Sequence, residues 1–116
     1  MKRDFVVPTD LDPLQRHPKA AAPGEAIRMH NPLCFGCGAE SAQGLHLEVR
    51  AADGFAVETS MLVESRFEGG PGVIHGGILS TAMDEVMGTV PLLVGPSAVT
   101  VHLEVDFVAP VPIGST

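Results

Sequence analysis

The stretch that decides the fold is residues 73–88, VIHGGILSTAMDEVMG, in which two glycines open an apolar helix. Glycine leaves the backbone N–H groups at a helix start unshielded, and the helix dipole favours negative charge at that end. Gly76 and Gly77 therefore predict a binding site for an oxyanion at the helix start.

The spacing within this stretch predicts two different helix faces. Asp84 follows Gly77 by seven residues, a step that returns to nearly the same side of a helix. Glu85 points about 100° away and is expected to be a solvated or interface charge. The first face is a stripe of mostly small residues, Gly77, Thr81, Asp84 and Gly88, and the opposite face carries Leu79, Ala82, Met83, Val86 and Val90. The pattern predicts a helix packed against a sheet, with a carboxylate on its other side.

Composition narrows the classes of function. The chain has 116 residues, 45% of them hydrophobic, which favours one folded core. A net charge of -7 and the lack of Trp and Tyr argue against binding of nucleic acid. No apolar run approaches the roughly 20 residues that span a bilayer, and the first residues lack the apolar region of a signal peptide. We therefore expect a cytoplasmic protein without a membrane partner.

The two cysteines form a CxxC motif, Cys34 and Cys37, which is too few for a disulfide framework and favours a reducing compartment. Together with His30 and His46 they suggest a zinc site, but the spacing of the histidines is irregular and no second CxxC is present. A redox role would need a helix directly after the motif. We interpret the cysteines as small residues packing a turn, and expect no metal and no cofactor.

The chain divides into two parts by pattern. Residues 1–28 mix prolines and charges and are predicted to form an N-terminal arm, and residues 29–116 are predicted to form the domain. Within the domain, residues 45–50 and 55–62 alternate apolar and polar side chains around a turn at Asp53 and Gly54. This pattern predicts a β-hairpin.

The helix and the residues after it complete the pattern. We expect the helix to end between Pro91 and Val94, because proline lacks an N–H group. Residues 99–107 then alternate most cleanly of all and predict a long strand, which Pro110 and Pro112 close. These elements are few to cover a helix, so we expect the domain to be C-terminally incomplete, with further strands from a parent protein or a partner.

Taken in order, several motifs resemble the hotdog-fold acyl-CoA thioesterases of the phenylacetic-acid-degradation type. The residues that carry the resemblance are CFGCG at 34–38, Gly44-Leu45, PGVIHGG at 71–77, Asp84, and FVAPVPIG at 107–114. The resemblance implies an α+β hotdog fold, in which a curved antiparallel sheet wraps a long central helix and two subunits pair around the active sites. It implies a homodimer or homotetramer acting on an acyl-CoA.

The resemblance also implies residue roles. The N–H of Gly77 would polarise the thioester carbonyl, and Asp84, reaching across the dimer interface, would act as nucleophile or general base. Thr100 would orient the water, and His75, Gly76 and Thr81 would contact the substrate. Some relatives place an asparagine six residues before the histidine, where this chain has Gly69.

Three functions follow as hypotheses. The first is an acyl-CoA thioesterase for a small or medium aryl or aliphatic acyl group. The second is a non-catalytic hotdog module that binds acyl-CoA or oligomerises. The third is a small metal-binding protein built on Cys34 and Cys37. Arg50 and Arg66 are candidate cations for the phosphates of coenzyme A.

Overall fold

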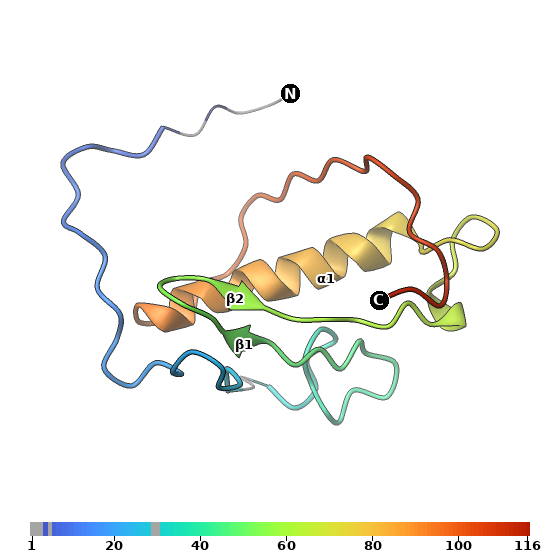
Figure 1. Ribbon diagram of the computed structural model, residues 1–116, viewed down its shortest axis with the longest axis horizontal. Helices are drawn as coiled ribbons and strands as arrows, with labels where there is room; N and C mark the ends of the chain where they lie inside the picture. Colours follow the sequence, from blue (N-terminus) through green and yellow to red (C-terminus); the bar gives the residue numbers. More distant parts are fainter. Residues whose placement is uncertain (1–3, 5, 29–30) are drawn as a thin grey trace.

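The computed structural model describes residue 4, residues 6–28 and residues 31–116. Its elements are the strands β1 (Arg50–Ala51) and β2 (Val57–Glu58), the 3₁₀ helices η1 (Ser65–Phe67) and η2 (Val90–Leu93), and the helix α1 (Gly76–Thr89). Figure 1 shows α1 running beside the hairpin of β1 and β2. Among the described residues, no helix is both long and apolar enough to cross a membrane.

Helix α1 begins at the two glycines, as predicted. His75 caps it with an extended backbone, and its Nδ1 atom accepts a hydrogen bond from the N–H of Gly77 at 2.9 Å. The helix runs into η2, which has Pro91 in its first turn and ends at Leu93. The predicted end of the helical segment is thus confirmed, and its last turn is the tighter 3₁₀ form.

The hairpin lies where it was predicted, but its ladder is short. The strands are antiparallel, with Arg50 opposite Glu58 and Ala51 opposite Val57, and Gly54 adopts φ +66° in the turn. The expected alternation holds along the first arm, whose odd-numbered residues from 45 to 51 are buried and whose even-numbered residues are exposed.

Outside the ladder, the first arm forms hydrogen bonds with the CxxC loop. The N–H groups of Leu45 and Leu47 donate to the carbonyls of Phe35 and Gly36, at 2.7 and 2.9 Å. From the second arm, the hydroxyl of Thr59 donates to the carbonyl of Glu48. The first arm is therefore bound to the CxxC loop for part of its length, and to Thr59 of the second arm through that residue's side chain.

Residues from the predicted N-terminal arm line the outer edge of β1. The N–H of Ile27 donates to the carbonyl of Val49, and the N–H of Ala51 donates to the carbonyl of Glu25, both within 2.9 Å. Ala26 forms an isolated antiparallel bridge with Arg50. The division between residues 1–28 and 29–116 stays a prediction.

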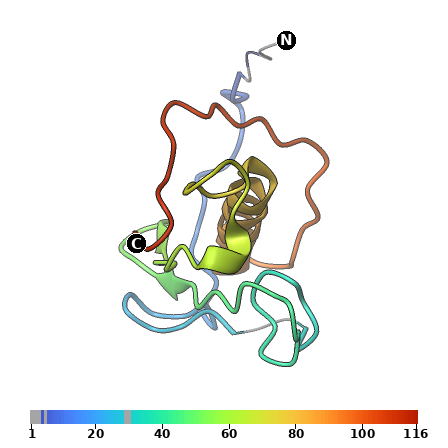
Figure 2. The same ribbon diagram turned by 90° about the vertical axis from the view of Figure 1, so that its right-hand side faces the viewer.

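The long strand predicted at residues 99–107 is wrong. These residues belong to no strand, and the side chains of Val99 and Val101 are 88% and 95% exposed. In Figures 1 and 2 the segment arches around α1 on the side away from the hairpin. A strand needs a neighbouring backbone to accept its hydrogen bonds, and this path meets none until residues 111–115, which bond to residues 63 and 72–74.

The core lies between α1 and the hairpin. Its buried residues are Leu45, Leu47, Val63, Phe67, Ile74 and Ala82, and its partly buried neighbours include Leu79 and Val86. Three of the five residues on the predicted apolar face, Leu79, Ala82 and Val86, thus belong to the core or pack against it, whereas Met83 is 45% exposed. One long helix with a small open antiparallel sheet of two strands confirms the α+β class and is consistent with the hotdog arrangement.

Candidate active site

The predicted carboxylate and the predicted hydroxyl meet in the structure. The Thr100 hydroxyl donates a hydrogen bond to Oδ1 of Asp84 at 2.6 Å. Asp84 comes from α1 and is half-buried, whereas Thr100 comes from the extended segment after η2 and is exposed. A hydrogen bond from a neutral hydroxyl to a carboxylate is of the short, charge-assisted kind, so it fixes the direction of the Asp84 side chain.

A cavity adjoins this pair. Its volume is about 330 Å³, and it lies between α1, η2 and the start of the extended segment. Its lining residues are Asp84, Glu85, Gly88, Thr89, Leu92, Ser97, Ala98, Val99 and Thr100. This volume is near the lower end of small-molecule sites.

The predicted oxyanion donor is occupied. The N–H of Gly77 donates to Nδ1 of His75, and the ring of this exposed histidine covers the helix start. The Thr81 hydroxyl donates to the carbonyl of Gly77 at 2.8 Å. An oxyanion can reach the Gly77 N–H only after the imidazole turns away, and the exposure of His75 leaves room for that rotation.

Gly76 is needed for a close approach. A Cβ atom at this position would lie 3.3 Å from two ring atoms of Phe107. The aromatic ring and the glycine share the wall of a second cavity, of about 380 Å³. Of the predicted substrate residues, His75 and Gly76 lie at the start of α1, whereas Thr81 lies in its second turn, three residues before Asp84.

Of the two expectations for Glu85, a solvated or an interface charge, the first is wrong. Glu85 is half-buried rather than solvated, and its Oε2 atom accepts a hydrogen bond from Sγ of Cys34 at 3.4 Å. The two neighbouring carboxylates on α1 therefore contact different parts of the chain. Asp84 contacts Thr100, and Glu85 contacts the CxxC loop. Nothing in the spacing of the sequence indicates this contact, because Cys34 and Glu85 are 51 residues apart.

The two cysteines are thiols in the structure. Burial raises the pKa of the Cys37 thiol far above its ordinary value, and the neighbouring Glu85 carboxylate and Cys34 raise it further. A thiol held in its neutral form is a poor nucleophile. Of the histidines considered as zinc ligands from sequence, His46 has a ring nitrogen 2.6 Å from the carbonyl oxygen of Ser41. His30 lies outside the described residues.

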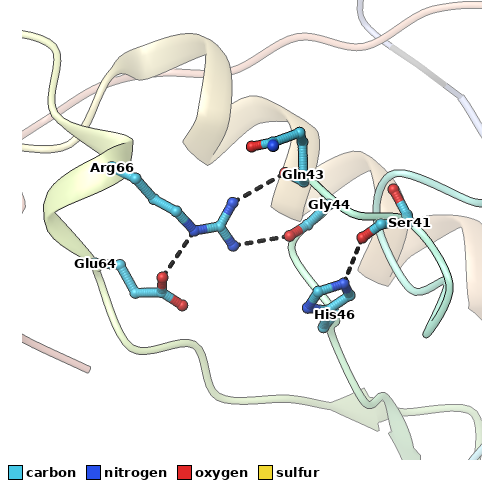
Figure 3. Close-up of polar contacts among 6 residues, drawn as sticks. All are labelled: Ser41, Gln43, Gly44, His46, Glu64 and Arg66. Atoms are coloured by element: carbon cyan, nitrogen blue, oxygen red, sulfur yellow. Dashed lines mark hydrogen bonds and ion pairs between the residues drawn. The ribbon is translucent and has the colours of Figure 1, made fainter.

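Neither arginine proposed for coenzyme A is available as a loose cation. Figure 3 shows Arg66 bonded to the Glu64 carboxylate at 2.7 Å and to the carbonyls of Gln43 and Gly44 at 2.9 and 2.8 Å. Arg50 bonds to the Glu48 carboxylate and to the carbonyl of Gly24. Arg66 thereby holds the loop that follows the CxxC motif.

The comparison with known families gives one match. Residues 71–116 match the model of the thioesterase superfamily, a segment that starts just before α1 and includes Asp84 and Thr100. The match covers less than half of the chain, and it indicates thioester hydrolysis as the general activity. No solved structure matches the chain.

Proposed function

We propose that this protein hydrolyses the thioester of a small acyl-CoA, with the Asp84 carboxylate at the reacting centre. The observation that supports it is the hydrogen bond from Thr100 to Asp84 beside a cavity. The match of the same segment to the thioesterase superfamily is a second, independent support. The modest volume of about 330 Å³ favours a small acyl group over a long one.

The chemistry needs two things, a base or nucleophile and an oxyanion donor. Thr100 donates to Oδ1 of Asp84, which leaves Oδ2 to take a proton from water or to attack the carbonyl carbon. General-base assistance of this kind typically contributes about 10²–10⁴ in rate, and one oxyanion donor about 3–4 kcal/mol. A thioester is already reactive, so this apparatus suffices.

The geometry of the helix favours a site shared by two subunits. Gly77 and Asp84 are seven residues apart, which separates them by roughly 10 Å along the axis of α1. One thioester carbonyl is too small to bridge that distance. We therefore propose that the Gly77 N–H of one subunit and the Asp84 carboxylate of another act on the same carbonyl, in a homodimer or a homotetramer.

The test is thiol release from a panel of short, long and aryl acyl-CoA esters. The wild type is expected to turn over a short or aryl ester, and Asp84→Asn to lose about 10²–10⁴ of that rate. Asp106→Asn, which changes an exposed carboxylate on the neighbouring segment, is the matched control and should keep full activity. Equal loss in both variants would contradict the proposal.

A non-catalytic acyl-CoA-binding module is the second candidate, and two observations favour it. The N–H of Gly77 is bonded to His75, and an apolar cavity of about 520 Å³, larger than the one beside Asp84, lies on the hairpin side of α1. This function predicts that the wild type binds an acyl-CoA without releasing thiol. Binding that survives Asp84→Asn, together with no turnover by either protein, would select it.

A further inference from the structure

The CxxC loop and α1 bring three metal-binding side chains together. One ligand atom from each of Cys34, Cys37 and Glu85 lies within 4.8 Å of the other two. All three side chains are half-buried. Glu85 adds a ligand from the centre of the fold, 51 residues beyond Cys34, which a local loop motif does not supply.

Two glycines allow the close approach of the groups in this cluster. A Cβ atom at Gly36 would lie 2.3 Å from Oε2 of Glu85, so this glycine leaves the space that the carboxylate occupies. A Cβ atom at Gly38 would lie 2.4 Å from the carbonyl oxygen of Pro32, so the loop folds tightly on itself. Arg66 bonds to the carbonyls of Gln43 and Gly44 (Figure 3) and so holds the segment that directly follows this loop.

The Glu85 carboxylate is incompletely hydrogen-bonded. Among the described residues, its Oε1 atom is buried and has no hydrogen-bond partner. The carboxylate's other contacts are with weak donors: Oε2 accepts a hydrogen bond from the thiol of Cys34, and the Cys37 thiol also hydrogen-bonds to Glu85. Buried carboxylates are ordinarily paired with a cation or bind a metal, so an ion at this point would satisfy the group.

We propose that Cys34, Cys37 and Glu85 bind a zinc ion. Two thiolates and a carboxylate suit zinc better than magnesium or calcium, which prefer oxygen ligands alone. In a tetrahedral site with Zn–S of about 2.3 Å and Zn–O of about 2.0 Å, sulfur and oxygen lie roughly 3.5 Å apart. Sγ of Cys34 and Oε2 of Glu85 are 3.4 Å apart.

The site has three protein ligands and one open position. Cys37 and Glu85 line a cavity of about 380 Å³, together with Thr89 and residues of the first hairpin arm. A water or a small thiol from this cavity would complete the tetrahedron. The ion would also tie the CxxC loop to α1, so its binding should stabilise the fold whether or not the protein is a thioesterase.

The experiment titrates Co²⁺ into the reduced, chelator-treated full chain. We expect one equivalent to bind with a thiolate-to-cobalt charge-transfer band, and one equivalent of Zn²⁺ to displace it. Glu85→Gln keeps both thiols and the shape of the side chain. Loss of a group that only hydrogen-bonds to a metal ligand costs about 10-fold in affinity or more, so loss of a ligand itself should weaken cobalt binding by more than about 10-fold. Glu40→Gln, an exposed glutamate on the same loop, should bind like the wild type.

Two further results separate a metal site from a packing role. Zinc should raise the thermal midpoint of the wild type and of Glu40→Gln, and leave that of Cys37→Ser unchanged. The proposal is overturned if the reduced wild type gives no thiolate band. It is equally overturned if Glu85→Gln binds cobalt as tightly as the wild type.

Discussion

The contact between Gly36 and Glu85 makes a prediction that depends on no assumption about function. In Gly36→Ala the added methyl carbon would lie 2.3, 2.5 and 2.6 Å from Oε2, Cδ and Cγ of Glu85. Ordinary contacts between carbon atoms are about 3.5–4.0 Å, so the carboxylate side chain must leave its position. Overpacking of this kind costs about 1–3 kcal/mol, and alanine recovers about 0.4–1 kcal/mol from the unfolded chain.

A double-mutant cycle isolates the contact. In a Glu85→Ala background the methyl group has room, so Gly36→Ala should stabilise by about 0.4–1 kcal/mol instead of destabilising. The coupling energy is then about 1–3 kcal/mol. The assay is urea unfolding followed by far-ultraviolet circular dichroism in the presence of a chelator, because the chain has no Trp or Tyr to report fluorescence.

Gly38→Ala is the control for this cycle. Its Cβ atom would meet backbone atoms of Pro32 and Cys34, which removal of the Glu85 side chain does not relieve. It should therefore destabilise both backgrounds equally. The reasoning is refuted if Gly36→Ala also changes the free energy of unfolding by the same amount in both.

Three further predictions concern α1 and its surroundings. Gly88→Ala should stabilise the protein by about 0.5–1 kcal/mol in urea unfolding, because its Cβ atom meets nothing within 4 Å; a loss of stability would contradict this. His75→Ala removes the N-cap acceptor of Gly77 and should cost about 1 kcal/mol by the same measurement, and an unchanged midpoint would show that the cap contributes nothing. In metal-free protein, stability should fall above about pH 8.5 by at most about 1.4 kcal/mol per pH unit, since the raised pKa of Cys37 keeps a proton in the folded state that the unfolded state has lost. Cys37→Ala should lack this part of the pH dependence, and an unaltered slope in that variant would refute it.

The parts of the fold that sequence could predict are those set by local pattern. The glycines before Ile78 and the proline at 91 mark the bounds of the helical segment, and the turn at Gly54 marks the hairpin. Alternation also predicts which side chains of the first hairpin arm are buried. In each case the signal and the structure it determines lie within a few residues of each other.

The parts that could not be predicted depend on partners far along the chain. Alternation at residues 99–107 specifies a segment with two faces, but not a neighbouring strand to bond with, and the described structure offers none. The contact of Glu85 with Cys34 joins the helix to a loop 51 residues away. Thr100 was named as a site residue through the family resemblance alone, because a threonine in an extended segment is ordinary by propensity, and its hydrogen bond to Asp84 was not predicted.

The central claim is that Asp84 and Thr100 act as one catalytic unit. It is tested most directly by kcat/KM for thiol release from the best acyl-CoA in the wild type, Asp84→Asn, Thr100→Val and the double variant. The lost hydrogen bond to a charged but partly exposed group should cost Thr100→Val about 10-fold, and Asp84→Asn about 10²–10⁴. We predict that the double variant is no slower than Asp84→Asn, because the hydroxyl acts through the carboxylate. Fully additive losses, or wild-type activity in Asp84→Asn, would contradict the claim.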